Sequence, residues 1–228
     1  MPSDKSLPAS RPEFDYGLAS GKAESRFVPR FLQINKYLNR PVASLLVRAV
    51  FRTRVTANQL TWMSFLMGLG GAYCLFQGKT WLFLVGGGLA QLSSIVDCAD
   101  GMLARARRQE SRFGAYLDLV FDRVTEFFLL AGTAYGVYRA TGRMGLLILG
   151  LVGGGLYFLD LTLYYLLKPY FGETGLGESA ESRSWLMFLI FVFGAANRLD
   201  WGIYLLFGAS TMILGGSLVR FFRAPKEG

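Results

Sequence analysis

The chain has 228 residues, 52% of them hydrophobic and 18% charged, and its 24 lysines and arginines exceed its 16 acidic residues to give a formal net charge of +8. The apolar composition excludes a disordered chain, and two cysteines are too few for a disulfide-stabilised scaffold. Four charge-free stretches approach or reach the roughly 20 residues that cross a bilayer as a helix, so we expect an integral membrane protein with no nucleic-acid partner. These stretches are residues 55–78, 80–96, 144–159 and 201–219.

The first 55 residues divide into a tail and an amphipathic segment. Residues 1–25 are mixed in polarity, contain prolines and serines and lack periodicity, which predicts a flexible tail. In residues 26–55 apolar residues recur at helical spacing with basic residues between them, which favours a juxtamembrane amphipathic helix on the cytoplasmic surface. Pro41 is expected to divide this helix in two. A soluble helix packed on a partner is the alternative.

Six apolar segments follow and predict an all-α integral membrane fold with six transmembrane helices over residues 56–222. The expected spans are residues 56–78, 81–104, 113–138, 144–167, 184–197 and 201–219, and residues 223–228 form a C-terminal tail. The fifth span is the shortest, and without it the C-terminus would change sides. Glycines cluster within the spans, which favours close packing between helices.

The basic residues are distributed unevenly about these spans. Nineteen of the 24 lysines and arginines fall on the side that carries both termini and the 105–112 loop, and four fall on the opposite side. The positive-inside rule therefore predicts cytoplasmic termini and a cytoplasmic 105–112 loop. We expect the membrane to be a bacterial or archaeal cytoplasmic membrane.

Two pairs of aspartates lie inside the predicted spans, where charged side chains are costly and need a reason. Asp97 and Asp100 are near the cytoplasmic end of the second span, and Asp118 and Asp122 are in the first turns of the third. Residues three or four apart share a helix face, and the short 105–112 loop makes the two helices antiparallel. All four carboxylates are therefore expected to meet at a similar depth, near the cytoplasmic side.

Carboxylates crowded into a low-dielectric site repel one another unless a cation lies between them. The chain contains no histidine, and oxygen ligands alone favour Mg²⁺, with Mn²⁺ possible. A general base would have to be a carboxylate, a tyrosine, a lysine or water. The sequence therefore predicts a divalent-cation site built from aspartates.

Residues beside the aspartates suit a nucleotide diphosphate. Gly101 and Gly114 would let a ligand approach the backbone, Arg105 could bind phosphate oxygens, and Ser111 could donate a hydrogen bond at a helix start. Each also has a structural explanation, namely helix packing for the glycines, membrane anchoring for Arg105 and an N-cap for Ser111. Their occurrence together favours a binding site.

The motif Asp97-x2-Asp100-Gly101-x2-Ala104-Arg105-x8-Gly114-x3-Asp118-x3-Asp122 resembles the signature of the class I CDP-alcohol phosphotransferases, with every fixed position present. The resemblance implies transfer of a substituted phosphoryl group from a CDP-linked donor to an acceptor hydroxyl, with release of CMP. It also implies a membrane-embedded homodimer. Many relatives have proline at the position of Ala57, a departure expected to alter local shape.

By the same resemblance, Asp97, Asp100 and Asp118 ligate one or two Mg²⁺ ions, and Asp122 serves as both metal ligand and general base. The residues expected to contact the CDP moiety are Asn58, Thr61, Asp97, Gly101, Ala104, Arg105, Ser111 and Gly114.

The donor and the acceptor are less specified by the sequence. The donor is expected to be of the CDP-diacylglycerol or CDP-inositol type, and the acceptor an alcohol such as inositol phosphate or glycerol phosphate. The run from Gln91 to Asp97 and the Asp122-Arg123 pair are similar to the CDP-inositol branch. The candidate acceptor-binding residues are Arg123, Asp160, Lys168, Arg183 and Arg220.

Each acceptor candidate has a structural alternative. Lys168, Arg183 and Arg220 could anchor the helices at the membrane surface. Arg123 could pair with Asp118 or Glu126 on its own helix, and Asp160 could form a hydrogen bond between helices.

A small cation channel or carrier with acidic lining residues is the competing hypothesis from a different class. A carrier would be expected to place its acids near the membrane midplane, often in broken helices. Here the aspartates cluster toward one end, next to an arginine-rich loop, which favours the enzyme.

Overall fold

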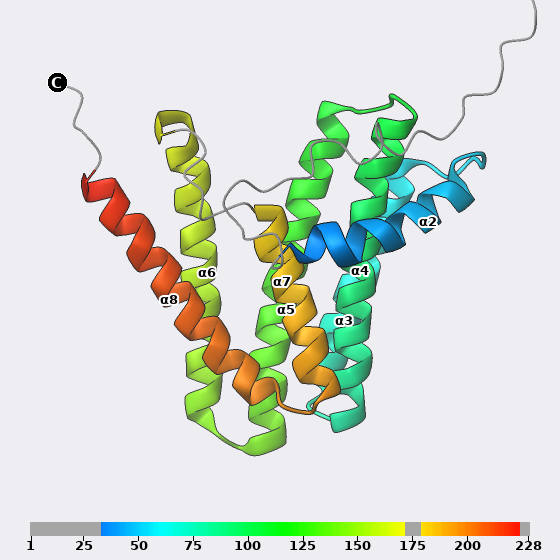
Figure 1. Ribbon diagram of the computed structural model, residues 1–228. Coiled ribbons are helices and arrows are strands. Elements are labelled where there is room, and N and C mark those ends of the chain that lie inside the picture. The colour runs from blue at the N-terminus through cyan, green and yellow to red at the C-terminus, as the bar shows by residue number, and fades with distance from the viewer. Residues whose placement is uncertain (1–32, 172–178, 224–228) are drawn as a thin grey trace, which may run out of the picture.

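The computed structural model describes residues 33–171 and 179–223, and within these ranges every regular element is a helix (Figure 1). The elements are η2 (Asn35–Asn39), α2 (Arg40–Val50), α3 (Ala57–Phe76), α4 (Thr80–Ala106), α5 (Arg112–Thr141), α6 (Met144–Phe171), α7 (Ser179–Ala195) and α8 (Leu199–Arg223). The expected tail 1–25, the start of the amphipathic segment and residues 224–228 lie outside the described residues. The all-α fold is confirmed.

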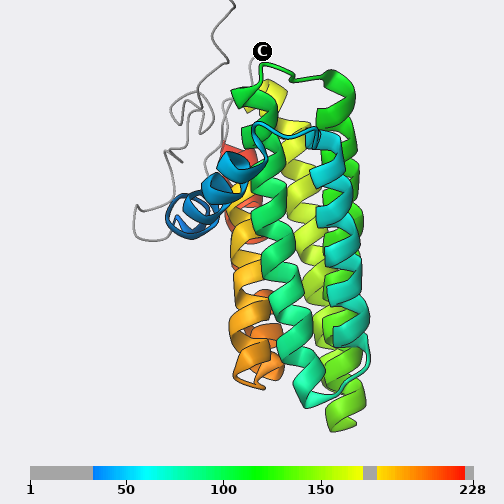
Figure 2. The same cartoon turned by 90° about the vertical axis from the view of Figure 1, so that its right-hand side faces the viewer.

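The long helices α3 to α8 run up and down, and the described connections α3–α4, α4–α5, α5–α6 and α7–α8 join neighbouring ends of the helices (Figures 1 and 2). Three of them contain segments long and apolar enough to cross a membrane, namely Thr80–Ala106, Met144–Tyr164 and Leu199–Val219. The apolar part of α7, Ser182–Ala195, is shorter. These helices indicate an integral membrane protein, while the count of six spans stays a prediction.

The helix before the bundle crosses α4 near the end where α4 connects to α5 (Figure 1). Ala43 and Val47 are fully buried on its inner face, whereas Leu45 is 64% exposed. The expected break at Pro41 is wrong, because the π-helical turn η2 continues directly into α2. Pro41 lies in the first turn of α2, where a missing backbone N–H costs little.

Arg107, just after α4, fastens the end of this helix to the bundle. Its guanidinium donates hydrogen bonds to the carbonyl oxygens of Val50 at 2.8 Å, Phe51 at 2.9 Å and Thr53 at 3.0 Å. Carbonyls at a helix C-terminus lack intrahelical partners, so one arginine satisfies several of them. The chain then enters α3 through a capping box formed by Thr56 and Gln59.

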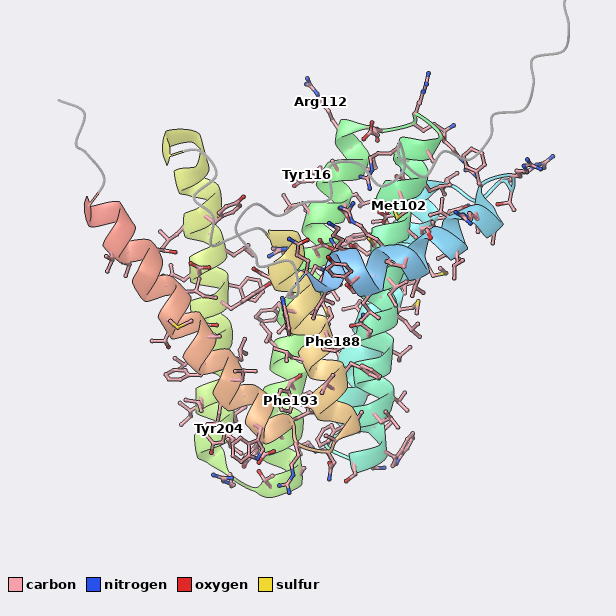
Figure 3. The ribbon with its side chains drawn as sticks, in the orientation of Figure 1. Met102, Arg112, Tyr116, Phe188, Phe193 and Tyr204 are labelled. Atoms are coloured by element: carbon pink, nitrogen blue, oxygen red, sulfur yellow. The ribbon has the colours of Figure 1, made fainter. Side chains whose placement is uncertain are left out.

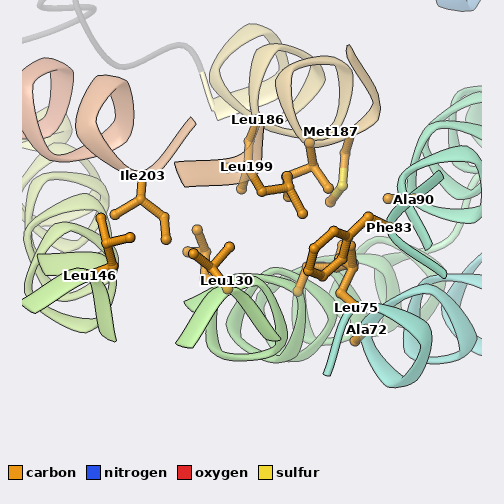
Figure 4. Packing of buried hydrophobic residues seen from close by; sticks show 13 residues of the cluster. Ala72, Leu75, Phe83, Ala90, Leu130, Leu146, Leu186, Met187, Leu199 and Ile203 are labelled. Atoms are coloured by element: carbon orange, nitrogen blue, oxygen red, sulfur yellow. The ribbon is translucent and has the colours of Figure 1, made fainter. Parts of the chain in front are cut away.

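The main apolar core lies between α3, α4, α5 and α7, and continues to α6 and α8 (Figure 4). Leu75, Leu129 and Met187 are fully buried in it. A second core, which includes Ala43, Met102 and Leu103, lies beneath α2. This second core holds the amphipathic helix against the half of α4 that carries the aspartates.

Glycines allow α3 and α4 to approach closely, as expected. A Cβ atom added at Gly86 would lie 2.8 Å from the Gly71 carbonyl oxygen and 2.8 Å from Leu75 Cγ. Neither neighbour is a flexible side-chain end, so the two helices would have to separate. Gly88 on the same helix has no described atom within 4 Å of that position.

We therefore expect Gly86→Ala to destabilise the protein by about 1–3 kcal/mol through overpacking. Gly88→Ala is the matched control and should be neutral or slightly stabilising, because alanine has the higher helix propensity. Thermal unfolding of the two variants in detergent measures the difference. Equal unfolding midpoints would contradict this account of helix packing.

Candidate active site

Three of the four motif aspartates converge between α4 and α5. Asp97, Asp100 and Asp118 each place a carboxylate oxygen within 4.8 Å of the others. Met102 and Tyr116, close to them in sequence, mark this end of the bundle in Figure 3, while Phe193 and Tyr204 mark the opposite end. The three-residue spacing on α4 and the short connection to α5 bring these carboxylates together, as the sequence predicts.

The oxygen atoms of this group fit a hard divalent cation. Asp97 Oδ1 and Asp118 Oδ1 are buried and have no hydrogen-bond partner within the described part of the chain. Asp100 is 5% exposed, and its Oδ2 accepts a hydrogen bond from the Thr61 hydroxyl on α3 at 2.6 Å. Buried carboxylate oxygens without donors are the ligands that Mg²⁺ or Mn²⁺ requires. Thr61 thus contacts a motif aspartate directly.

Asp122 stands outside this group of three and pairs with an arginine from a different helix. Arg183 on α7 forms ion pairs with Asp97 and, through Nη2, with Asp122 Oδ1 at 2.8 Å. Its side chain is only 6% exposed. The positive charge of Arg183 therefore lies inside the acidic cluster, rather than at the membrane surface where an anchoring residue would be.

Glu126 is a further acidic residue of this site, outside the motif, that the sequence offered only as a possible partner of Arg123. It is fully buried and pairs with Arg123 at 2.8 Å, while its Oε1 lies 3.7 Å from Nε of Arg183. Asp118, Asp122 and Glu126 are spaced four residues apart on α5, so they share a face. This four-residue spacing is the feature of the sequence from which Glu126 could have been assigned to the site. The ion pair with Glu126 is the structural explanation that the sequence analysis offered for Arg123.

A cavity of about 370 Å³ opens onto the acidic cluster. Its walls come from η2, α4, α5 and α7, so the N-terminal helix and α7 complete a site that α4 and α5 begin. The lining residues are Asn35, Ser94, Asp97, Cys98, Ala115, Asp118, Leu119, Asp122, Arg123, Arg183 and Ser184.

The remaining residues expected to contact CDP form two small groups near the same end. A Cβ atom at Gly114 would lie 3.4 Å from Asn58 Oδ1, and the Ser111 hydroxyl accepts a hydrogen bond from the Gly114 N–H at 3.0 Å. Ser111 is therefore the N-cap of α5. The guanidinium of Arg105 lies over Gly101, where an added Cβ would be 3.3 Å from Nη1. Ala104 is half-buried beside Arg105.

Asp160 does not line the acidic cavity. Its Oδ1 accepts a hydrogen bond from the Ser217 hydroxyl on α8 at 3.0 Å, which is the expected helix-to-helix alternative. It faces a separate, mainly apolar cavity of about 380 Å³ between α5, α6, α7 and α8. The side chains of Lys168 and Arg220 lie outside the described residues.

The motif aspartates of this site lie in a part of the chain that matches a known family model. Residues 54–159 match the family model of the CDP-alcohol phosphatidyltransferases. The chain carries a CDP-alcohol phosphatidyltransferase domain. The family resemblance drawn from the aspartate motif is thereby confirmed, because this range contains the whole motif.

Several curated relatives are similar to this chain in sequence. The bifunctional IPC transferase and DIPP synthase of Aquifex aeolicus is 37% identical over 101 residues, which are 44% of this chain and 22% of that protein. The chain covers between 19% and 27% of the four bifunctional relatives of this name. The archaetidylinositol phosphate synthase of Pyrococcus horikoshii is 27% identical over 187 residues, 79% of this chain and 87% of that protein.

A solved structure shares the fold beyond the CDP-alcohol phosphatidyltransferase domain itself. The crystal structure of the Mycobacterium tuberculosis phosphatidylinositol phosphate synthase with CDP-DAG bound has a TM-score of 0.66 and 22% identity to this chain. The match covers 82% of this chain and 96% of that one. The helical arrangement around the domain is therefore one that a solved protein also adopts.

We expect Arg183→Gln to destabilise the metal-free protein by roughly 3–5 kcal/mol, because it leaves buried carboxylates without their counter-charge. Arg198→Gln, at an exposed arginine at the opposite end, is the control and should change stability by less than about 0.5 kcal/mol. Unfolding in detergent with EDTA compares them. Equal stability of the two variants would mean that Arg183 is not the counter-charge of the cluster.

Proposed function

We propose that the protein is a membrane-embedded CDP-alcohol phosphotransferase. It moves a substituted phosphoryl group from a CDP-linked donor to an acceptor hydroxyl and releases CMP. The convergence of Asp97, Asp100 and Asp118 within 4.8 Å, inside a domain that matches the CDP-alcohol phosphatidyltransferase model, carries this proposal. The location of the cluster toward one end of the bundle also favours an enzyme over a cation channel or carrier.

The substrates are proposed from the activities for which the relatives are named. The similarity to an archaetidylinositol phosphate synthase, which covers 79% of this chain and 87% of that protein, supports an inositol phosphate acceptor and a lipid-linked CDP donor. The shorter similarity to IPC transferase and DIPP synthase proteins supports a CDP-inositol donor instead. A phosphorylated acceptor requires a cation in the cavity, and Arg183 is the buried arginine that lines it next to Asp97 and Asp122.

Asp97, Asp100 and Asp118 are the residues proposed to hold Mg²⁺, with Mn²⁺ as a substitute, and Asp122 is a further candidate ligand. When bound, the ion would offset the negative charge of the donor diphosphate and of the departing CMP. The Thr61 hydroxyl donates a hydrogen bond to Asp100 Oδ2 and so helps to orient this carboxylate. Arg105, Gly101, Ala104, Asn58, Ser111 and Gly114 are proposed to contact the CDP moiety.

Asp122 is proposed to be the general base. The acceptor oxygen forms a bond to the phosphorus atom distal to cytidine, and its proton passes to the Asp122 carboxylate. The bond between that phosphorus and the bridging oxygen breaks, and the electron pair leaves with CMP. Asp122 lines the cavity, and Arg183 orients one of its oxygens, so the other can face the acceptor.

We also propose that α3 to α8 are six membrane spans, with both termini and the site on the cytoplasmic side and η2 and α2 on the membrane surface. The large exposed apolar side chains along α3, such as Trp62, Leu66 and Tyr73, support contact with lipid. A homodimer is proposed from the family resemblance. A Cβ atom added at Gly155 on α6 or at Gly208 on α8 would meet no described atom within 4 Å outside its own helix turn, which leaves room for a second copy.

The first experiment is Mg²⁺-dependent CMP release by the detergent-purified protein, given CDP-diacylglycerol or CDP-inositol with inositol phosphate, glycerol phosphate or serine. We expect CMP from one donor with inositol phosphate. CMP from the lipid donor alone indicates phospholipid headgroup synthesis, and CMP from CDP-inositol alone indicates synthesis of a soluble inositol phosphodiester. No CMP from any combination, with Mg²⁺ present and the protein folded, would contradict the proposed function.

Single substitutions separate the proposed roles. Asp97→Asn, Asp100→Asn or Asp118→Asn should abolish CMP release in a folded protein. Asp122→Asn should keep donor binding and lose transfer by about 10²–10⁴-fold, the usual contribution of a general base. Asp200→Asn, outside the site in the first turn of α8, is the control and should behave as the wild type. Substantial turnover by Asp122→Asn would remove Asp122 as the base.

A further inference from the structure

A buried amide links the N-terminal helix to two helices of the site. Asn39, the last residue of η2, is 1% exposed. Its Nδ2 donates hydrogen bonds to the hydroxyls of Ser94 on α4 at 3.0 Å and Ser184 on α7 at 3.3 Å. Its Oδ1 accepts a hydrogen bond from Nε2 of Gln91 on α4 at 2.8 Å. Both donors and the acceptor of this amide are therefore used.

The two serines connect the amide to the acidic cluster. Ser94 lies three residues before Asp97 on α4, and Ser184 follows Arg183 on α7. Both serines line the acidic cavity, whereas Asn39 and Gln91 do not. Asp97 and Arg183 also form an ion pair with each other. The planar amide thus sets the spacing of α4 and α7 at the level where these two charged residues meet.

Packing alone does not explain a polar side chain at this position. Ala43 and Val47, one and two turns further along, are fully buried with apolar side chains. An apolar residue in place of Asn39 would cover the same surface without specifying how far apart α4 and α7 lie. Hydrogen bonds have narrow distance ranges, so a fully satisfied buried network specifies one arrangement.

We propose that Asn39 is a positioning residue, which holds Asp97 and Arg183 in their working geometry through Ser94 and Ser184. This inference rests on the proposed function of the same site. It assigns to the N-terminal helix a part in the chemistry beyond anchoring. Outer residues that orient metal-binding side chains typically change metal affinity or activity by about 10–100-fold when replaced.

The test compares Asn39→Leu with Ser44→Ala, using Mn²⁺ alone as the probe. Asn39→Leu keeps a similar volume and removes the amide. Ser44 is buried in the adjoining α2 helix, and its hydroxyl donates to the Pro41 carbonyl at 2.6 Å, away from the site. Electron paramagnetic resonance of free Mn²⁺ measures binding by the full chain in detergent. We expect about tenfold or weaker Mn²⁺ affinity in Asn39→Leu and wild-type affinity in Ser44→Ala.

A purely structural role for Asn39 would lower the unfolding midpoint and leave the Mn²⁺ affinity of the folded protein unchanged, and that result would overturn the proposal. If Asn39→Leu does not fold, Gln91→Met decides the question, because Gln91 does not line the cavity and, among the described residues, its amide donates its hydrogen bond to Asn39. Weaker Mn²⁺ binding by Gln91→Met would support the proposal, and unchanged binding would refute it. Absence of CMP release by the wild type with normal Mn²⁺ binding would contradict the proposed function alone.

Discussion

The arrangement of the site depends on the ion pairs that the buried guanidinium of Arg183 forms with the surrounding carboxylates. Asp97, Asp122 and Glu126 approach one another on α4 and α5, and burying them together without a cation would cost several kcal/mol. Arg183 offsets part of this charge and leaves Asp97 Oδ1 and Asp118 Oδ1 without hydrogen-bond partners among the described residues. The arginine therefore makes the fold compatible with a dense acidic cluster, and the remaining negative charge is left for a bound metal ion to offset.

The rest of the bundle keeps the helices that carry these charges at fixed distances. Gly71 and Gly86 bring the backbones of α3 and α4 together, and this contact places Thr61 within hydrogen-bond distance of Asp100. Arg107, just after α4, holds the C-terminal end of α2 in place through hydrogen bonds to the Val50 and Phe51 carbonyl oxygens. Because a helix is stiff over this length, contacts far from the aspartates still determine where their side chains lie.

The sequence predicted the parts of the site that local spacing controls. Asp97 and Asp100 share a face of one helix, and Asp118 follows a short connection, so their meeting needs no knowledge of distant packing. The position of Arg183 could not be derived in this way, because it lies about 60 residues further along on α7 and its location depends on tertiary packing. Pro41 was misjudged, since a proline in the first turn of a helix is well tolerated. Glu126 falls outside the motif, so the sequence offered it as a possible partner of Arg123 but not as a member of the charged cluster around Arg183.

Some residues of the site lie inside the range that matches the family model, and others lie outside it. This division suggests which parts of the site could differ between enzymes that use different substrates. The family match ends at residue 159, so it contains the aspartates that would handle the donor diphosphate. Asn35, Arg183 and Ser184, which complete the cavity wall, lie outside it. Because η2 and α7 are separate from the helices that carry the aspartates, their residues in the cavity wall can change without moving the carboxylates. The condition is that Arg183 is kept to balance the carboxylate charge. The acceptor is therefore expected to be selected mainly by η2 and α7, and the transfer chemistry to reside in α4 and α5.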